Sequence, residues 1–300
     1  MNTDAMNIKT LGTETINVDT LGTNAMDIKQ KYEICVSSLK DYVESAGFTD
    51  VVIGLSGGID SSVVAALCVD AFGSTHVHGV LMPGPYSTDH SISDAQDLAA
   101  CLGIDTVQMS ICEPYEAFEK VYETSCGQTL SGLASENTQA RCRMIFLMAL
   151  SNANNWLVIN TGNKSEAMMG YSTLYGDTCG AFAPLGGLYK TDVFAMARWM
   201  NERASGEKEG SGQVIPLHII NKPPSAELSA GQEDETSLGI AYKDLDTILI
   251  AAFEEGKSAQ EIAKMGYEQK EVERIISRAK SMSFKRAMEP SYPNVAFYVK

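Results

Sequence analysis

The sequence predicts an α/β fold, in which a doubly wound, Rossmann-like parallel sheet is followed by helices at the C-terminal end. Four short apolar segments rich in β-branched residues alternate with segments whose apolar residues recur every three or four positions. Strand–helix units in series form parallel strands joined by right-handed crossovers. With 300 residues, 44% of them hydrophobic, the chain can bury one large core.

Each element has its own signal. The first strand is predicted at 51–55, a segment too short and too β-branched for a helix, and further strands at 77–82, 106–111 and 157–159. The helices between and after the strands each have one apolar face. In chain order, these faces consist of Val64, Leu67, Cys68, Ala71 and Phe72; Ala95, Leu98, Ala99 and Leu102; Ala140, Met144, Leu147 and Met148; and Val193, Met196, Ala197 and Met200.

The predicted sheet also indicates where a ligand would bind. In open parallel sheets the ligand lies beyond the carboxyl ends of the strands. We therefore expect the loops after Leu55, Met82, Ile111 and Ile159 to converge on one site.

Two segments differ in composition from this core. Residues 1–28 form an N-terminal extension, in which TLGT occurs at 10–13 and again at 20–23, and residues 29–300 form one domain. We expect a mobile loop at 204–213, which is rich in glycine, serine and charge.

The chain is acidic, with a net charge of −15. This charge argues against nucleic acid as the main partner, because a phosphate backbone is bound by clustered lysine and arginine. Two short helices predicted within 258–280, around Gly266, lack a basic face, so their apolar residues Val272, Ile275 and Ile276 are assigned to packing. An anionic substrate must therefore be bound by local positive groups.

The seven cysteines form no CxxC pair and lie mostly in apolar segments, so neither a zinc site nor a disulfide framework is predicted. No apolar run reaches the roughly 18 residues of a membrane helix, and the polar N-terminus has no signal-peptide core. We expect a cytoplasmic protein with reduced thiols and no membrane partner.

The segment VVIGLSGGIDSS at 51–62 is the strongest functional signal. Gly57 and Gly58 let the chain turn sharply, and serine hydroxyls lie beside the free N–H groups of a helix start, which favour an anion such as phosphate. Asp60 would repel phosphate unless a divalent cation lay between them, so the segment predicts magnesium as well. The alternative is a plain strand-to-helix turn capped by Asp60. Neither the lysine-bearing phosphate loop nor a GxGxxG turn is present.

A second polar segment, at 159–177, follows the fourth strand. Glu166 could complete a magnesium site with Asp60, and Thr161 could hydrogen-bond a nucleotide. The alternative is a capped surface helix whose charged residues form ion pairs.

Cationic residues in two predicted helices are further candidates. Arg141 and Arg143 lie on the helix before the fourth strand, where an arginine could bind phosphate or carboxylate; the alternative is a solvated face. Lys190 begins a helix, where a cation opposes the dipole, and an anionic ligand would explain its position. The acidic residues 233–235 follow a proline pair, as in a lid or a connector. No Ser–His–Asp or Cys–His arrangement predicts a protein nucleophile.

Seven sequence blocks together resemble NAD synthetase. They are GLSGGIDSS (54–62), MPGPYSTDHS (82–91), ENTQARCRM (136–144), TGNKSE (161–166), TLYGD (173–177), KT (190–191) and PPSAEL (223–228). The first block is shared by the N-type ATP pyrophosphatases, which have the adenine nucleotide alpha hydrolase-like fold. The later blocks are more specific, and they look closest to the synthetase half of the glutamine-dependent enzymes. We expect no amidohydrolase domain in front, because only some 30 residues precede the fold.

The resemblance implies a two-step amidation of deamido-NAD. The nicotinate carboxylate attacks the α-phosphate of ATP and releases pyrophosphate, and ammonia then displaces AMP to give NAD. It further implies Mg²⁺, a homodimer, and loops at 83–92 and 221–236 that close over ATP; a separate glutaminase could supply the ammonia. The alternatives are another ATP-pyrophosphatase amidotransferase half and a non-catalytic adenine-nucleotide-binding protein.

The resemblance also assigns roles to single positions. Asp60 and Glu166 match the magnesium ligands of the family. Asp177 is the candidate to hold ammonium and take its proton. Lys190 is placed to stabilise the negative charge that develops during the reaction. The positions that match ATP contacts are Gly54, Leu55, Ser56, Gly57, Gly58, Ile59, Asp60, Ser61, Thr161, Lys190 and Ser225. Those that match deamido-NAD contacts are Asn137, Arg141, Glu166 and Lys285.

Overall fold

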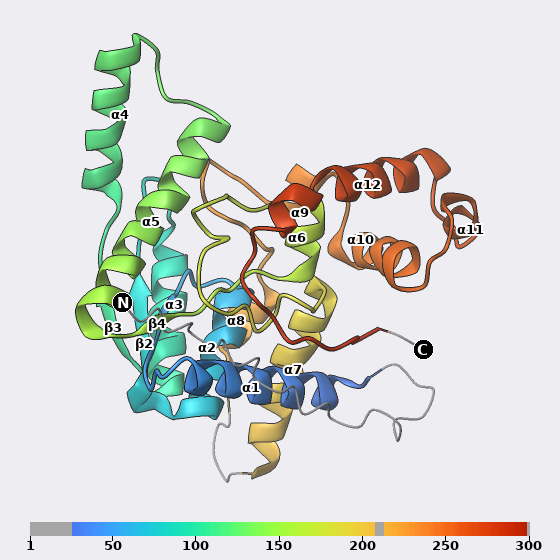
Figure 1. The fold of residues 1–300 in the computed structure, drawn as a ribbon, viewed down its shortest axis with the longest axis horizontal. Helices are drawn as coiled ribbons and strands as arrows, with labels where there is room; N and C mark the ends of the chain where they lie inside the picture. Colours follow the sequence, from blue (N-terminus) through green and yellow to red (C-terminus); the bar gives the residue numbers. More distant parts are fainter. Residues whose placement is uncertain (1–25, 208–212, 299–300) are drawn as a thin grey trace, which may run out of the picture.

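The computed structural model describes residues 26–207 and 213–298, and it contains a four-stranded parallel sheet (Figure 1). The strands are β1 (Val51–Gly54), β2 (Val77–Leu81), β3 (Asp105–Gln108) and β4 (Leu157–Val158), in the spatial order β3-β2-β1-β4. All three strand pairs are parallel. The predicted fold class is confirmed, and the strand order reverses between β1 and β4, where a doubly wound sheet binds its ligand.

Helices cover both faces of the sheet. Val51 and Ile53 of β1 point into the larger core, which includes residues of α1 (Ile28–Ser45), α2 (Ile59–Phe72) and α7 (Lys190–Glu207). Val52 points the other way, into a smaller core with residues of α4 (Cys112–Cys126) and α5 (Leu133–Asn154). The alternation follows from the two-residue period of a strand.

The predicted helical faces are largely buried, with one exception on α5. Ala140, Met144 and Leu147 are buried there, whereas Met148 is 41% exposed. Successive residues of a helix are rotated by about 100°, which puts Met148 at the edge of the stripe rather than within it.

The edges of the sheet differ from the prediction. β3 ends at Gln108, although the chain still follows β2, with the Met109 N–H donating to the Leu81 carbonyl. β4 has two residues, and Ile159 forms an isolated parallel bridge to Phe182, which in turn bridges Ser291. The first bridge spans 23 residues and the second 109, and each joins single residues, so no local pattern in the sequence indicates them.

The expected loop at 204–213 is partly wrong, because α7 continues to Glu207. Asn201 holds the returning chain against this last part of the helix: its side-chain oxygen accepts from the N–H groups of Val214 and Ile215, each at 2.8 Å. Residues 208–212 lie outside the described residues, as do the TLGT repeats of the N-terminal extension.

The C-terminal helices pack together on the side of the molecule opposite α4 (Figure 1). They are α10 (Tyr242–Leu249), η3 (Ile250–Glu254), α11 (Ala259–Ala263), α12 (Gln269–Ser281) and α13 (Ser283–Arg286). The two helices predicted around Gly266 are α11 and α12, and Val272 and Ile275 are buried as expected, while Ile276 is half-buried.

Five further elements lie among the described residues: η2 (Ser74–His76), α3 (Asp89–Leu102), α6 (Lys164–Met169), α8 (Leu217–Asn221) and α9 (Asp234–Leu238). Within residues 26–207 and 213–298, no helix is both long and apolar enough to cross a membrane.

Candidate active site

A cavity of about 690 Å³ lies beyond the carboxyl ends of β1, β2 and β4. Three of the four loops predicted to converge, those after Leu55, Met82 and Ile159, line it. The loop after Ile111 does not, and here the prediction is wrong. The reason is that β3 is the edge strand and α4 begins directly at Cys112, which carries the chain away from the site.

The glycine-rich turn forms one wall of the cavity, and it is held by its own serines. The Ser56 side chain accepts from the Gly58 N–H at 3.1 Å, and Gly58 is the N-cap residue of α2. Gly57 has a φ of +74°, and a Cβ there would lie 2.2 Å from the Ser91 carbonyl oxygen of α3. The cavity is lined by Gly54, Leu55, Ser56, Gly58, Ile59, Asp60 and Ser61, whereas Gly57 faces α3.

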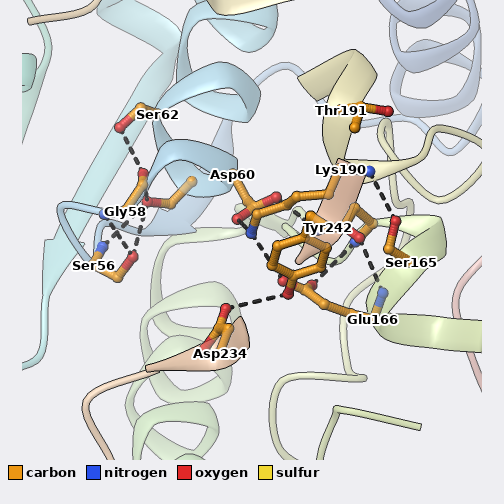
Figure 2. Close-up of polar contacts among 12 residues, drawn as sticks. Ser56, Gly58, Asp60, Ser62, Ser165, Glu166, Lys190, Thr191, Asp234 and Tyr242 are labelled. Carbon is orange, nitrogen blue, oxygen red and sulfur yellow. Dashed lines mark hydrogen bonds and ion pairs between the residues drawn. The ribbon is translucent and has the colours of Figure 1, made fainter. Parts of the chain in front are cut away.

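A buried lysine joins the two carboxylates of the predicted metal site (Figure 2). Lys190 is 1% exposed, and its Nζ lies 2.5 Å from Asp60 Oδ2 and 3.2 Å from Glu166 Oε1. The three residues come from the starts of α7, α2 and α6. Burial alone would lower the pKa of Lys190, but the two carboxylates outweigh it and raise the pKa, so the ammonium stays charged.

Capping interactions fix the positions of these side chains. Asn163 and Glu166 form a capping box at the start of α6, and the Asn163 amide donates to Asp60 Oδ1 at 2.8 Å. The backbone N–H of Lys190 donates to the Ser165 hydroxyl at 2.8 Å, and Ser165 in turn donates to Asp246. The chain start of α7 is thereby attached to α6 and α10.

The electrostatics of this cluster favour an additional cation. Burial raises the pKa of Glu166 to about 8, and Lys190 opposes that shift. Asp234 adds a third carboxylate: burial raises its pKa, and its Oδ1 is buried with no hydrogen-bond partner among the residues that the structure describes. Tyr242 donates to the other oxygen of Asp234 at 3.3 Å, and its ring lies 5.1 Å from Lys190 Nζ (Figure 2).

The carboxylates fit magnesium in their chemistry. Asp60 and Glu166 both reach the same ammonium group, and carboxylate oxygen is the ligand that Mg²⁺ prefers. Within the part of the chain that the structure describes, no set of three histidine, cysteine or acidic side chains is grouped closely enough to hold a metal ion. A magnesium ion would therefore share Asp60 and Glu166 with Lys190 and take further ligands from phosphate or water.

The other predicted residues that line the cavity lie along α5 and the segments after β4. They are Asn137, Thr161, Asp177, Ser225 and Lys285. Asp177 is exposed to the cavity and accepts a hydrogen bond from the Thr173 N–H. The protein atoms around its carboxyl group remove water from it, and this desolvation raises its pKa to about 6. Lys285 donates to the carbonyls of Gly170 and Ser172, at 2.9 and 2.6 Å, which ties α13 to this wall.

Arg141 is the one predicted residue besides Gly57 that does not line the cavity. It is exposed on α5 and donates to the Leu174 carbonyl at 3.2 Å. Arg143, two residues later, does line it. Residues two apart on a helix point about 200° apart, so one of the two arginines must face away.

The 222–232 segment crosses one side of the cavity and is attached to α3. Glu227 has a φ of +50°, and its carboxylate accepts from the Thr88 N–H at 3.2 Å and from the Ser91 hydroxyl at 2.7 Å. Lys222 Nζ lies 2.6 Å from Asp94 Oδ2. The Gln139 amide of α5 donates to the Leu228 carbonyl at 3.0 Å. The segment therefore contacts two helices on opposite faces of the sheet.

Residues 31–289 match the NAD synthase family. The chain belongs to the NAD synthase family. It is 42% identical over 258 residues to the glutamine-dependent NAD(+) synthetase of Thermotoga maritima, an alignment covering 86% of this chain and 44% of that protein. It is 38% identical over 255 residues to the NH(3)-dependent NAD(+) synthetase of Wolinella succinogenes, covering 85% and 92% of the two chains. The chain thus spans about half the length of the glutamine-dependent relatives.

Solved structures of the NAD synthase family share the fold. The NMN synthetase of Francisella tularensis matches with a TM-score of 0.71 and 31% identity, over 87% of this chain and 96% of that one. The glutamine-dependent NAD+ synthetase of Acinetobacter baumannii, in complex with ADP, matches with a TM-score of 0.62 and 34% identity, over 93% of this chain and 49% of that one.

Sequence reasoning missed Asp234, and it assigned the substrate contact on α5 to Arg141, whereas Arg143 is the arginine that lines the cavity. Asp234 lies in an acidic run that is typical of a solvated connector, and only the fold buries it beside Tyr242. For Arg143 a signal was present. It falls at i+3 from Ala140 and i−4 from Leu147, within the buried stripe of α5, where an arginine is unusual.

Proposed function

We propose that this chain is an ammonia-dependent NAD synthetase that amidates deamido-NAD to NAD and converts ATP to AMP and pyrophosphate. One observation carries the proposal. A single cavity contains the glycine-rich turn and the Lys190 cluster together with Asp177 and Asn137, so an activated acid and its amine would meet in one enclosure. Membership of the NAD synthase family, a group of ligases that use ATP in NAD biosynthesis, agrees with this chemistry.

In the first step, a carboxylate oxygen of the acid attacks the α-phosphorus of ATP, the bond to the bridging oxygen breaks, and pyrophosphate leaves. The backbone N–H groups at the start of α2 and the serine hydroxyls of the turn bind phosphate oxygens. Lys190 supplies positive charge where negative charge develops on the phosphates. When bound by Asp60 and Glu166, Mg²⁺ would neutralise further phosphate charge.

In the second step, ammonia attacks the acyl carbon of the adenylate, and AMP leaves with the electron pair of the broken C–O bond. The nitrogen must lose a proton, and the Asp177 carboxylate is the base exposed to the cavity. Its pKa is raised to about 6, closer to physiological pH than that of an ordinary aspartate, which suits a group that accepts a proton during the reaction.

A defined assay tests the proposal. The purified chain with ATP, Mg²⁺, deamido-NAD and ammonium should form NAD, AMP and pyrophosphate in equal amounts. Glutamine in place of ammonium should give no product unless a separate glutaminase is added. ATP binding without AMP release under these conditions would instead support a non-catalytic nucleotide-binding protein, and turnover with other carboxylates alone would support another amidotransferase half.

Nicotinate mononucleotide is the second candidate substrate, because an NMN synthetase is among the structures that match well. Both acids have the same reacting pyridine carboxylate and differ in the presence of the adenylate half. The ratio of kcat/KM for the two acids decides between them. We expect deamido-NAD to be preferred, and a preference for the mononucleotide would replace this assignment.

We also infer a homodimer with α4 and α5 at its interface, and a cytoplasmic location. Both helices expose several large apolar side chains. Monomeric soluble proteins rarely expose large apolar patches to water. These residues are Phe118, Val121, Leu133, Ile145 and Met148.

A further inference from the structure

Arg143 is a cation held in the cavity wall with most of its hydrogen-bonding capacity unused. Its Nε donates to the Met82 carbonyl at 3.0 Å, which attaches α5 to the end of β2. Within residues 26–207 and 213–298, no ion pair joins it to a carboxylate, and no other hydrogen bond engages the guanidinium. The side chain is half-buried, and it lines the cavity.

The backbone beside Arg143 makes room for this group. A Cβ added at Gly84 would lie 2.9 Å from Arg143 Nη2 and 3.0 Å from Ile111 Cδ1. Any other residue at position 84 would therefore press on the guanidinium. The end of β2 thus provides both an acceptor for Nε and space for the terminal nitrogens.

Three other arginines have partners for their terminal nitrogens, whereas Arg141 and Arg278, like Arg143, donate only through Nε among the described residues. Arg203 pairs with Asp70 at 2.8 Å, Arg274 pairs with Glu271 at 2.7 Å, and Arg286 donates to the Ala279 carbonyl at 2.7 Å. Arg143 differs from them in that its environment lowers its pKa through burial, the sign of a charge that protein has partly removed from water.

Two carboxylates lie close enough to favour the charged form of Arg143 without pairing with it. They belong to Asp177, the proposed base of the second step, and to Glu227 of the 222–232 segment. A partly desolvated guanidinium with free terminal nitrogens is suited to a bidentate oxyanion, either phosphate or carboxylate.

We propose that Arg143 is a substrate-binding residue, and that its terminal nitrogens hold an oxyanion of a bound substrate at the end of the cavity lined by Met82 and Pro83. This assignment rests on the proposed function for the identity of the ligands. The oxyanion is a phosphate of ATP or the carboxylate of the acid to be amidated, and the two sources are separated by experiment.

Binding to the full chain, measured by calorimetry without turnover, is the test. ATP with Mg²⁺ and deamido-NAD are titrated separately into the wild type, R143K and R143M. We expect R143M to bind one of the two ligands about tenfold or more weakly, as for a lost charge-assisted bidentate contact. R143K, which keeps the charge but loses the fork, should fall between. The ligand that is affected identifies the oxyanion.

Arg198 of α7 provides the matched control, because it lies outside the cavity and 5.7 Å from the Phe194 ring. R198M should leave both affinities unchanged. The melting temperature of each variant reports loss of the Met82 contact separately. If R143M and R143K bind both ligands as the wild type does, Arg143 is only a bridge to β2 and the assignment is wrong.

The outcome also separates the two proposals. If R143M does not fold, R143K decides alone, since a lysine can still donate to the Met82 carbonyl. A wild-type chain that binds both ligands but forms no NAD contradicts the proposed function and leaves the Arg143 assignment standing. A wild-type chain that binds neither ligand contradicts both.

Discussion

At the scale of single residues, the site depends on charges that the fold keeps apart from water. Lys190 is fully buried between two carboxylates, and removing one member of such a group typically costs about 3–5 kcal/mol because it leaves the others unpaired. Asp177 is different, because it faces the cavity without a cationic partner within salt-bridge distance among the described residues. Its protonation therefore responds to pH in the range where the enzyme would work.

Asp177 predicts a pH dependence of the second step. Its pKa is raised to about 6, so the carboxylate base is present above that pH and is lost as the pH falls through it. Amide formation from the adenylate should rise with pH through about 6 and then level off, which single-turnover experiments with trapped adenylate can measure. D177N should still release pyrophosphate, form the amide about 10²-fold or more slowly and lose this pH step. An unchanged profile in D177N would assign the proton to another group.

Gly57 predicts a steric requirement beyond that of a turn. Both Gly57 and Gly73 have positive φ angles, of +74° and +82°, but only at Gly57 would a Cβ meet another atom closely. G57A should lower the free energy of unfolding by about 1–3 kcal/mol more than G73A and weaken ATP binding, because α3 must move. Urea unfolding and ATP titration of the two variants check this. Equal losses in both would mean that backbone conformation alone is responsible.

The two arginines of α5 mark the limit of residue-level prediction. The positions of the glycine-rich turn, Asp60 and Glu166 at the cavity could be predicted from the sequence, because the residues that suggest a ligand site lie within a few consecutive positions. Arg141 and Arg143 are equally plausible in composition, and only the face of α5 that meets the cavity separates them. The stripe of Ala140, Met144 and Leu147 contains that information.

At the scale of elements, the 222–232 segment is attached by polar contacts more than by apolar packing. Glu227 accepts from Thr88 and Ser91 across 136 residues or more of sequence, and Lys222 pairs with Asp94. Carboxylates near a helix N-terminus are stabilised by the free N–H groups there. Because such contacts exchange easily with water, we expect this segment to open at a lower free energy than the core.

Glu227 predicts how firmly this segment is held. E227Q removes the charge at the start of α3, so hydrogen exchange in 225–232 should become severalfold faster and the KM for ATP should rise. The control E233Q changes an exposed acid of the same region whose carboxylate accepts, among the described residues, only from Thr236. If E227Q exchanges like the wild type, the contacts to Leu228 and Lys222 are sufficient to hold the segment.

The central strands and their helices were predictable because their apolar periods are local. The bridges of Ile159 to Phe182 and of Phe182 to Ser291 were not, since each pairs single residues from distant segments. The last turn of α7 was misjudged for a related reason. Its composition favours a loop, and the Asn201 contacts that hold the chain there come from tertiary structure.

At the scale of the whole molecule, an acidic chain encloses a site with basic groups. The net charge is −15, yet Lys190, Lys285 and Arg143 all line the cavity. These local groups supply the positive charge that the proposed anionic substrates would need, as the composition implied.

The exposed apolar residues of α4 and α5 predict a dimer. Light scattering should give twice the mass of one chain, and a double change of Val121 and Ile145 to glutamate should give monomers, because two charges per copy would be buried at the interface. Replacing Met265, an exposed apolar residue at 46% on the C-terminal side, by glutamate is the control. A wild-type chain that remains monomeric at micromolar concentration contradicts the prediction.

The ammonium–carboxylate cluster takes its members from residues 60, 166, 190 and 234. During synthesis, the glycine-rich turn leaves the ribosome long before the lysine and the last acid that surround it. A nascent chain therefore lacks part of this cluster until residue 234 has been made, and the turn alone cannot offer nucleotide the complete set of charges.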